Sequence, residues 1–91
     1  MKLPNTDIAK LVRDAGIEAM EALNTILTDT TPYISAEEGK EVRLAVAKAI
    51  SSILDNIVNP VLRDYPELDV DEDLWGEIAA ARARSRLASK A

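Results

Sequence analysis

The amino-acid sequence predicts an all-α protein of one domain. Its 91 residues are 47% hydrophobic, which suits a folded core, and only 3% are aromatic. The core must therefore be built mainly from Ile, Leu, Val and Ala, and Leu and Ala favour helices. Apolar residues recur at steps of three and four over two long segments, and no segment shows the alternation that is typical of a strand.

The first predicted helix covers residues 6–29. Asn5 or Thr6 can cap it, because either side-chain oxygen can accept a hydrogen bond from a free amide of the first turn. Its apolar residues form one stripe, which we expect the fold to bury: Ile8, Leu11, Val12, Ala15, Ala19, Leu23, Ile26 and Leu27. Gly16 lies inside this helix, where glycine costs roughly 1 kcal/mol relative to alanine. It marks either a close approach of a second helix or a tolerated weak point.

The second predicted helix covers residues 36–58. Ser35 and Glu38 have the spacing of a capping box, in which each side chain accepts a hydrogen bond from the backbone amide of the other residue. The apolar stripe of this helix is wide: Val42, Ala45, Val46, Ala49, Ile50, Ile53, Leu54 and Ile57. A helix that is apolar over so much of its circumference needs more than one neighbour.

The third predicted helix covers residues 71–88. We expect Asn59 and Pro60 to end or kink the second helix, because proline has no amide proton and disfavours helix in the preceding residue. A short turn near residues 60–65 then leads to the third helix. Its apolar stripe is thin and consists mostly of small residues, and we expect residues 86–91 to fray or to be disordered.

Two long helices with a short connection predict an antiparallel hairpin, each helix being about 35 Å long at 1.5 Å per residue. The hairpin leaves part of the second helix uncovered. We therefore expect a homodimer in which two hairpins form a helical bundle; the alternative is a monomeric three-helix bundle. The candidate self-association residues all lie on the second helix: Val46, Ile50, Ile53, Leu54 and Ile57.

Charge is sorted along the C-terminal part of the chain, whose overall net charge is −5. Residues 61–77 hold seven acidic residues and one basic residue, whereas residues 78–91 hold four basic residues and no acidic one. Trp75 lies at the boundary, where it either anchors a partner or closes the end of the core. The candidate partner-binding residues are drawn from both segments and from this boundary: Asp69, Asp71, Glu72, Asp73, Trp75, Arg82 and Arg86.

Three interpretations fit the basic segment that contains Arg82, Arg84 and Arg86. Positive charge at the end of a helix is favoured by the helix dipole, at roughly 0.3–1 kcal/mol for each well-placed exposed charge. The arginines can also contact the acidic residues 64–73, within the chain or across a dimer. Binding to phosphate groups is the third interpretation, but the protein is acidic overall and no aromatic or Gly-rich element accompanies the arginines.

The residue types present argue against catalysis. The chain has no cysteine and no histidine, which removes thiol chemistry and the usual general base. Asp69, Asp71 and Asp73 match the first ligand positions of a calcium-binding EF-hand loop, but Leu74 and Ala80 stand where that loop requires Gly and Glu. We therefore expect no enzyme activity, no cofactor and no bound metal.

Taken together, these features predict a small non-catalytic helical protein that serves in protein–protein interaction or assembly. The alternative is an acidic inhibitor or regulator that binds a basic partner through residues 64–73. Nucleic-acid binding through the C-terminal arginines is a weaker third hypothesis. No apolar run approaches the roughly 20 residues that span a bilayer, so we expect no membrane contact and a cytoplasmic location.

Overall fold

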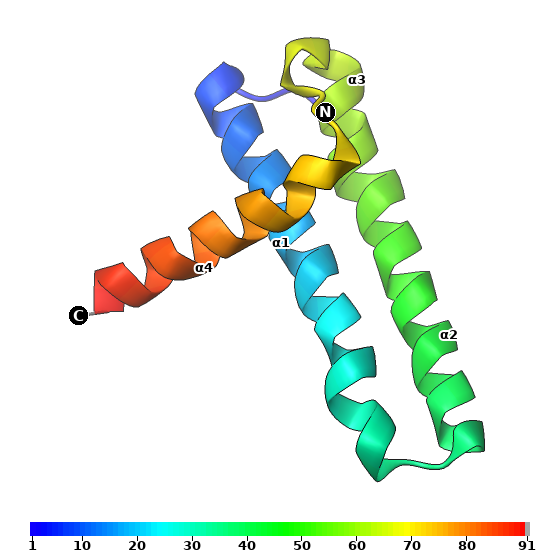
Figure 1. The fold of residues 1–91 in the computed structure, drawn as a ribbon. Coiled ribbons are helices and arrows are strands. Elements are labelled where there is room, and N and C mark those ends of the chain that lie inside the picture. Colours follow the sequence, from blue (N-terminus) through cyan, green and yellow to red (C-terminus); the bar gives the residue numbers. More distant parts are fainter. Residues whose placement is uncertain (91) are drawn as a thin grey trace.

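The computed structural model describes the backbone of residues 1–90 and the side chains of residues 1–87, and its helices are α1 (Thr6–Thr30), α2 (Ala36–Ile53), α3 (Asn59–Asp64) and α4 (Trp75–Lys90). Short 3-10 turns are η1 (Thr31–Tyr33), η3 (Pro66–Leu68) and η4 (Glu72–Leu74). No strand occurs within residues 1–90, so the all-α prediction is confirmed. Figure 1 shows α1 and α2 as an antiparallel hairpin, with α4 crossing α1 near the end that is remote from the hairpin loop.

The beginnings of the first two helices agree with the sequence prediction. The side chain of Asn5 accepts a hydrogen bond from the amide of Ile8 at 3.0 Å and caps α1. At the start of α2, the Glu38 amide donates to Ser35 Oγ at 3.1 Å, and the Ser35 amide donates to Glu38 Oε1 at 2.8 Å. The predicted capping box is therefore present, and both boundaries are set by residues within one helical turn.

Of the two expectations for Asn59 and Pro60, an end or a kink of the second helix, the end is not observed. The chain stays helical through Asn59 and Pro60, because α2 continues as a π-helical segment, η2 (Leu54–Val58), and then as α3. In an α-helix the ring of Pro60 would crowd the carbonyl of the residue four positions earlier. In η2 the amide of Asn59 instead bonds to the carbonyl of Leu54, five positions back, and this wider turn carries the helix past the proline.

The last helix begins slightly later than predicted. The residue before η4 is Asp71, whose side chain makes no capping hydrogen bond, and η4 leads directly into α4. The helix then extends to Lys90. Fraying was expected at residues 86–91. The side chains of residues 88–90 and the whole of Ala91 lie outside the described part of the chain.

The hydrophobic core lies where α4 crosses the hairpin. One cluster joins Ile17, Met20 and Val58, and a second joins Ala9, Val61 and Leu68. No residue between positions 21 and 45 is buried, so the half of the hairpin nearest the loop has no core of its own. The core therefore supports only one end of two long helices.

The face that α1 buries differs from the predicted one. Of the expected stripe, Val12, Leu23 and Leu27 are half-buried, whereas the other five residues are exposed: Ile8, Leu11, Ala15, Ala19 and Ile26. The core uses the neighbouring face instead, which carries the buried residues Ala9, Gly16, Ile17 and Met20. Helix α1 is apolar over two adjoining faces, and only one of them is covered within the chain.

Gly16 explains why this face was chosen. A Cβ atom at this position would lie 3.0 Å from Val58 Cγ2, 3.2 Å from Ile57 Cγ2 and 3.6 Å from Ile53 Cγ2. These distances leave no room for a methyl group without movement of branched side chains. Of the two interpretations of Gly16, the close approach of a second helix is therefore the correct one.

The molecule is more extended than a compact chain of its length. Its radius of gyration is 15.0 Å, whereas a compact domain of this length has about 12 Å. Its accessible surface is 6368 Å², about 1,200 Å² more than the roughly 5,200 Å² expected for a folded monomer of 9.9 kDa. In Figure 1, the loop end of the hairpin and the C-terminal part of α4 both project from the crossing of the helices.

Candidate protein interaction surface

An uncovered apolar surface runs along α1. We call it the α1 stripe, and it consists of six exposed residues: Ile8, Leu11, Ala15, Ala19, Ala22 and Ile26. Their spacing of three, four or seven residues places them on one side of the helix. Leu11 is 55% exposed, and Ile8 and Ile26 are 37% and 38% exposed. The stripe contains no charged or polar residue, and large apolar side chains at its two ends flank the alanines in its middle.

Helix α4 is fastened to another side of α1 by Glu18. The Arg82 Nε donates to Glu18 Oε1 at 3.1 Å, and the Arg86 Nη1 donates to the same oxygen at 2.8 Å. The Arg86 Nη2 lies 2.7 Å from Glu18 Oε2, which is an ion-pair distance, although the angle is too poor for a hydrogen bond. The Glu18 side chain is only 11% exposed, so these two arginines neutralise an almost buried carboxylate.

This arrangement changes the interpretation of the basic segment. The acid that Arg82 and Arg86 contact is Glu18 on α1, and not a residue of the acidic segment 64–73. This pairing could not be read from the sequence, because Glu18 lies more than 60 positions before the arginines. Arg84 lies on the exposed side of α4. Nucleic-acid binding through these arginines stays a prediction, with two of the three engaged inside the chain.

Arg13 is a second buried charge that the sequence did not reveal. It is 5% exposed, and its Nε donates to Asp14 Oδ1 at 2.8 Å. Its Nη1 donates to the carbonyl oxygen of Leu68 at 2.5 Å, which ties η3 to α1. The same segment is held by the Leu68 side chain, which packs with Ala9 in the core. Arg13 is therefore part of the framework that carries the chain from α3 to α4.

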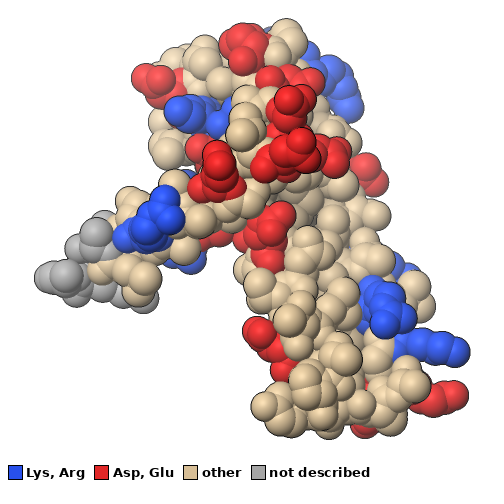
Figure 2. Space-filling model, in the orientation of Figure 1, with Lys and Arg blue, Asp and Glu red and all other residues tan. Residues whose placement is uncertain are grey.

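The predicted partner-binding residues lie in two places. Asp69, Glu72 and Trp75 line one hollow, whereas Arg82 and Arg86 contact Glu18. One side of the half-buried Trp75 packs against the cluster of Ile17, Met20 and Val58, and the residue also lines the hollow, so both interpretations of Trp75 stay open. Four acids point outward into solvent: Asp69, Asp71, Glu72 and Asp73. Figure 2 shows acidic side chains gathered over the end of the molecule where α3 and the start of α4 lie. A partner for this acidic surface stays a prediction.

The predicted self-association residues on the second helix lie mainly against α1. Val46 is buried, and Ile50, Ile53, Leu54 and Ile57 are half-buried. Ile53 and Ile57 approach Gly16, while Ile50 and Leu54 pack against the cluster around Ile17. Self-association through these five residues stays a prediction, but the larger exposed apolar surface belongs to α1.

Similarity to known proteins gives no guide to the role of these surfaces. No family model, curated protein or solved structure matches the chain. In the described part of the chain, no three acidic residues come together as metal ligands would. None of the described helices is both long and apolar enough to cross a bilayer.

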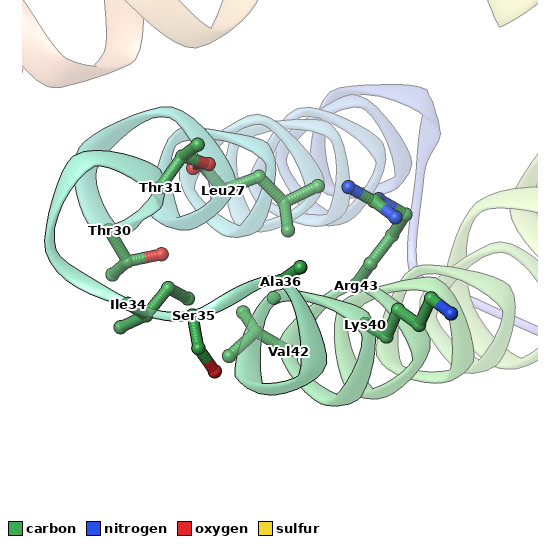
Figure 3. A pocket seen from close by; sticks show the side chains of 10 residues that line it. Leu27, Thr30, Thr31, Ile34, Ser35, Ala36, Lys40, Val42 and Arg43 are labelled. Carbon is green, nitrogen blue, oxygen red and sulfur yellow. Dashed lines mark hydrogen bonds between the residues drawn. The ribbon is translucent and has the colours of Figure 1, made fainter.

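A hollow of about 370 Å³ lies between the end of α1 and the start of α2. Figure 3 shows Leu27 and Arg43 extending into the space between the two helices, with Lys40 at the rim. The hydroxyl groups in the lining are already engaged, because Thr30 donates to the carbonyl of Ile26 and Ser35 belongs to the capping box. No carboxylate lines the hollow, which lies at the loop end of the hairpin, where no residue is buried.

Proposed function

We propose that this chain is a small non-catalytic helical protein that acts by binding another protein surface through the α1 stripe. The observation that carries this proposal is the exposure of the most regular apolar face of α1. Contiguous apolar surface on a small protein is costly to leave in water, and such patches commonly mark interaction sites. Polar side chains lie only beside the stripe, where Leu11 and Ala22 border hollows next to α4.

The lopsided core supports the same proposal. The loop half of the hairpin has no buried residue between positions 21 and 45, although it carries apolar side chains on both helices. A two-helix hairpin without a third layer buries little apolar area. A partner that covers the α1 stripe would supply that layer to Leu23 and Ile26. Binding and the ordering of the loop half would then be parts of one event.

A photoreactive benzoylphenylalanine at Ile26 tests this proposal in the source cells. The α1 stripe should yield covalent adducts, whatever the identity of the bound protein. The matched control places the same residue at Leu44, which is 58% exposed, compared with 38% for Ile26, but lies outside the stripe on α2. The proposal fails if Ile26 yields no more adducts than Leu44.

The acidic surface around Asp69 and Asp71 supports a second candidate function, the binding of a basic protein. Together with Glu72 and Asp73 these carboxylates are exposed, and none of the four takes part in a described ion pair. Such a surface accelerates association with a basic partner. Changing the four acids to their amides separates the two candidate functions. If the acidic surface binds a basic protein, this variant should lose that partner, while binding through the α1 stripe should stay intact.

A further inference from the structure

We infer that the protein that covers the α1 stripe is a second copy of this chain, with the two α1 helices antiparallel about a two-fold axis at the level of Ile17. This inference rests on the proposed function, because it names the occupant of the same surface. Three properties of the stripe and of the molecule lead to it: the order of residue sizes along α1, the position of the core, and the area that is left uncovered.

The apolar residues on the stripe side of α1 are arranged symmetrically about the level of Ile17. A two-fold axis at this level places Ile8 opposite Ile26 of the second copy, and Ala15 opposite Ala19 of the second copy. The two remaining stripe residues each meet a half-buried apolar residue, since Leu11 then faces Leu23, and Ala22 faces Val12. Every one of these pairs is apolar, and the small residues meet at the centre, where two helices come closest. Two-fold interfaces require a surface that is complementary to itself, and this stripe meets that requirement.

Ile17 itself does not obstruct this arrangement. It is fully buried and packs with Met20 and Val58 on the side of α1 that faces the interior of its own chain. The two-fold axis therefore passes between the two helices at a level where neither presents a bulky exposed side chain. The alanines at positions 15 and 19 lie on either side of the axis and allow the close contact of helices that bulky residues would prevent.

Antiparallel pairing also brings support to the half of the hairpin that lacks a core. The N-terminal half of α1 is held by the two buried clusters, whereas its C-terminal half is not. In the inferred dimer the supported half of one copy lies against the unsupported half of the other. Leu23 and Ile26 then gain neighbours from a rigid part of the second copy, which a parallel arrangement would not provide.

The uncovered area is of the size that a stable dimer uses. The chain exposes 6368 Å², about 1,200 Å² more than a compact monomer of its mass. A standard protein–protein interface takes about 800 Å² from each partner. A contact of standard size with a second copy would therefore bury an area equal to about two-thirds of this excess. An unrelated partner would need an apolar surface that is complementary to the α1 stripe, and α1 of a second copy already has such a surface.

Sedimentation equilibrium at micromolar concentration measures the first consequence. The full chain should have about twice the mass of 9.9 kDa. Ala19→Arg places a charge beside the two-fold axis and should reduce the mass to that of one chain, with the helical circular dichroism retained. The matched control is Ala47→Arg, an exposed alanine of α2 outside the stripe, which should leave the dimer intact.

Cysteine cross-linking measures the register, since the chain has no cysteine of its own. In the antiparallel arrangement two Cys residues at position 8 lie about 27 Å apart, for 18 residues at 1.5 Å each. Ile8→Cys alone and Ile26→Cys alone should therefore not form interchain disulfides. The double variant should form interchain disulfides readily, because the thiol at position 8 of one copy faces the thiol at position 26 of the other copy.

Two results would overturn the inference. One is a single-chain mass for the unmodified protein throughout the micromolar range; the other is a dimer that Ala19→Arg leaves intact, or that Ile8→Cys alone cross-links. These results do not decide the proposed function, which fails if the photoreactive residue at Ile26 yields no more adducts than the one at Leu44. The protein could also be a monomer whose residue 26 captures a different protein. That result would support the proposed function and would contradict the inference of a dimer.

Discussion

Gly16 controls how closely α1 and the second helix can approach each other. Its missing side chain leaves room for the methyl groups of Val58 and Ile57, both of which belong to stiff, β-branched residues. The two helices therefore meet at the faces that carry Gly16 and Ile53, and the α1 stripe is turned outward. A single residue thus decides which of two apolar faces remains available for binding.

Gly16→Ala should lower the free energy of unfolding, even though alanine favours helix by roughly 1 kcal/mol. Crowding against Val58 and Ile57 costs about 1–3 kcal/mol in a packed core, which exceeds the gain in helix propensity. Gly39→Ala is the matched control, because its Cβ would come no closer than 4.0 Å to Ile34 Cδ1. Urea unfolding should show a loss for Gly16→Ala and a gain for Gly39→Ala. A gain for both would contradict the close approach.

The capping box at Ser35 makes a specific prediction about pH. The pKa of Glu38 is lowered, first by the hydrogen bond from the Ser35 backbone amide and then by the bond with its hydroxyl group. A lowered pKa in the folded state stabilises the protein above the ordinary pKa of Glu, and this contribution disappears as the pH falls through the lowered value. An NMR titration should place the Glu38 midpoint below its usual range. In Ser35→Ala the midpoint should rise, and an unchanged midpoint would exclude the hydroxyl group as a cause.

At the scale of the elements, α4 depends on a contact that no local pattern reveals. Its own apolar stripe is thin, and Trp75 and Ile78 hold only its beginning against the core. Further along, Arg82 and Arg86 hold it through the carboxylate of Glu18. The C-terminal part of α4 projects beyond that contact (Figure 1). The docking of α4 is therefore partly electrostatic.

Arg82→Ala and Arg86→Ala should each weaken the docking of α4 by about 1 kcal/mol, the usual size for a partly exposed ion pair with hydrogen bonds. Both changes together should cost more, because Glu18 is then left almost buried without a cation. Hydrogen exchange of the α4 amides should accelerate in these variants, and added salt should accelerate it in the unmodified protein. Arg84→Ala is the control, and an equal effect from it would contradict the role of Glu18.

Sequence reasoning succeeded where structure is decided by neighbouring residues. The caps at Asn5 and Ser35 and the positions of the helices follow from side chains within one turn of each boundary. Sequence reasoning left open whether the helix ends or kinks at Pro60, where tertiary packing of Val58 and Val61 keeps the chain helical and a π turn relieves the clash. It failed for the orientation of α1, because helical periodicity gives the faces of a helix but not which neighbour each face meets. For the same reason, the sequence could not predict that Arg82 pairs with Glu18.

At the scale of the whole molecule, the distribution of buried surface is the main property to be explained. The core is gathered at one end, and the other end of the hairpin has none, so the isolated chain has an unusually large surface for its mass. A chain of 91 residues has little stability to spare. Coverage of the α1 stripe by a second copy would complete the core of both chains, which makes assembly a part of folding.

The thermal stability of the protein should therefore depend on its concentration. A partner that binds only the folded chain stabilises it by mass action. For a dimer, each tenfold increase in concentration adds about 0.7 kcal/mol per chain, which corresponds to roughly 3–5 °C in Tm for a protein of this size. Calorimetry between about 5 and 500 µM should show this rise for the unmodified protein and for Ala47→Arg. The Tm of Ala19→Arg should be lower and constant, since that chain unfolds alone. A constant Tm for all three proteins would mean that the α1 stripe contributes nothing to the folded state of a second copy.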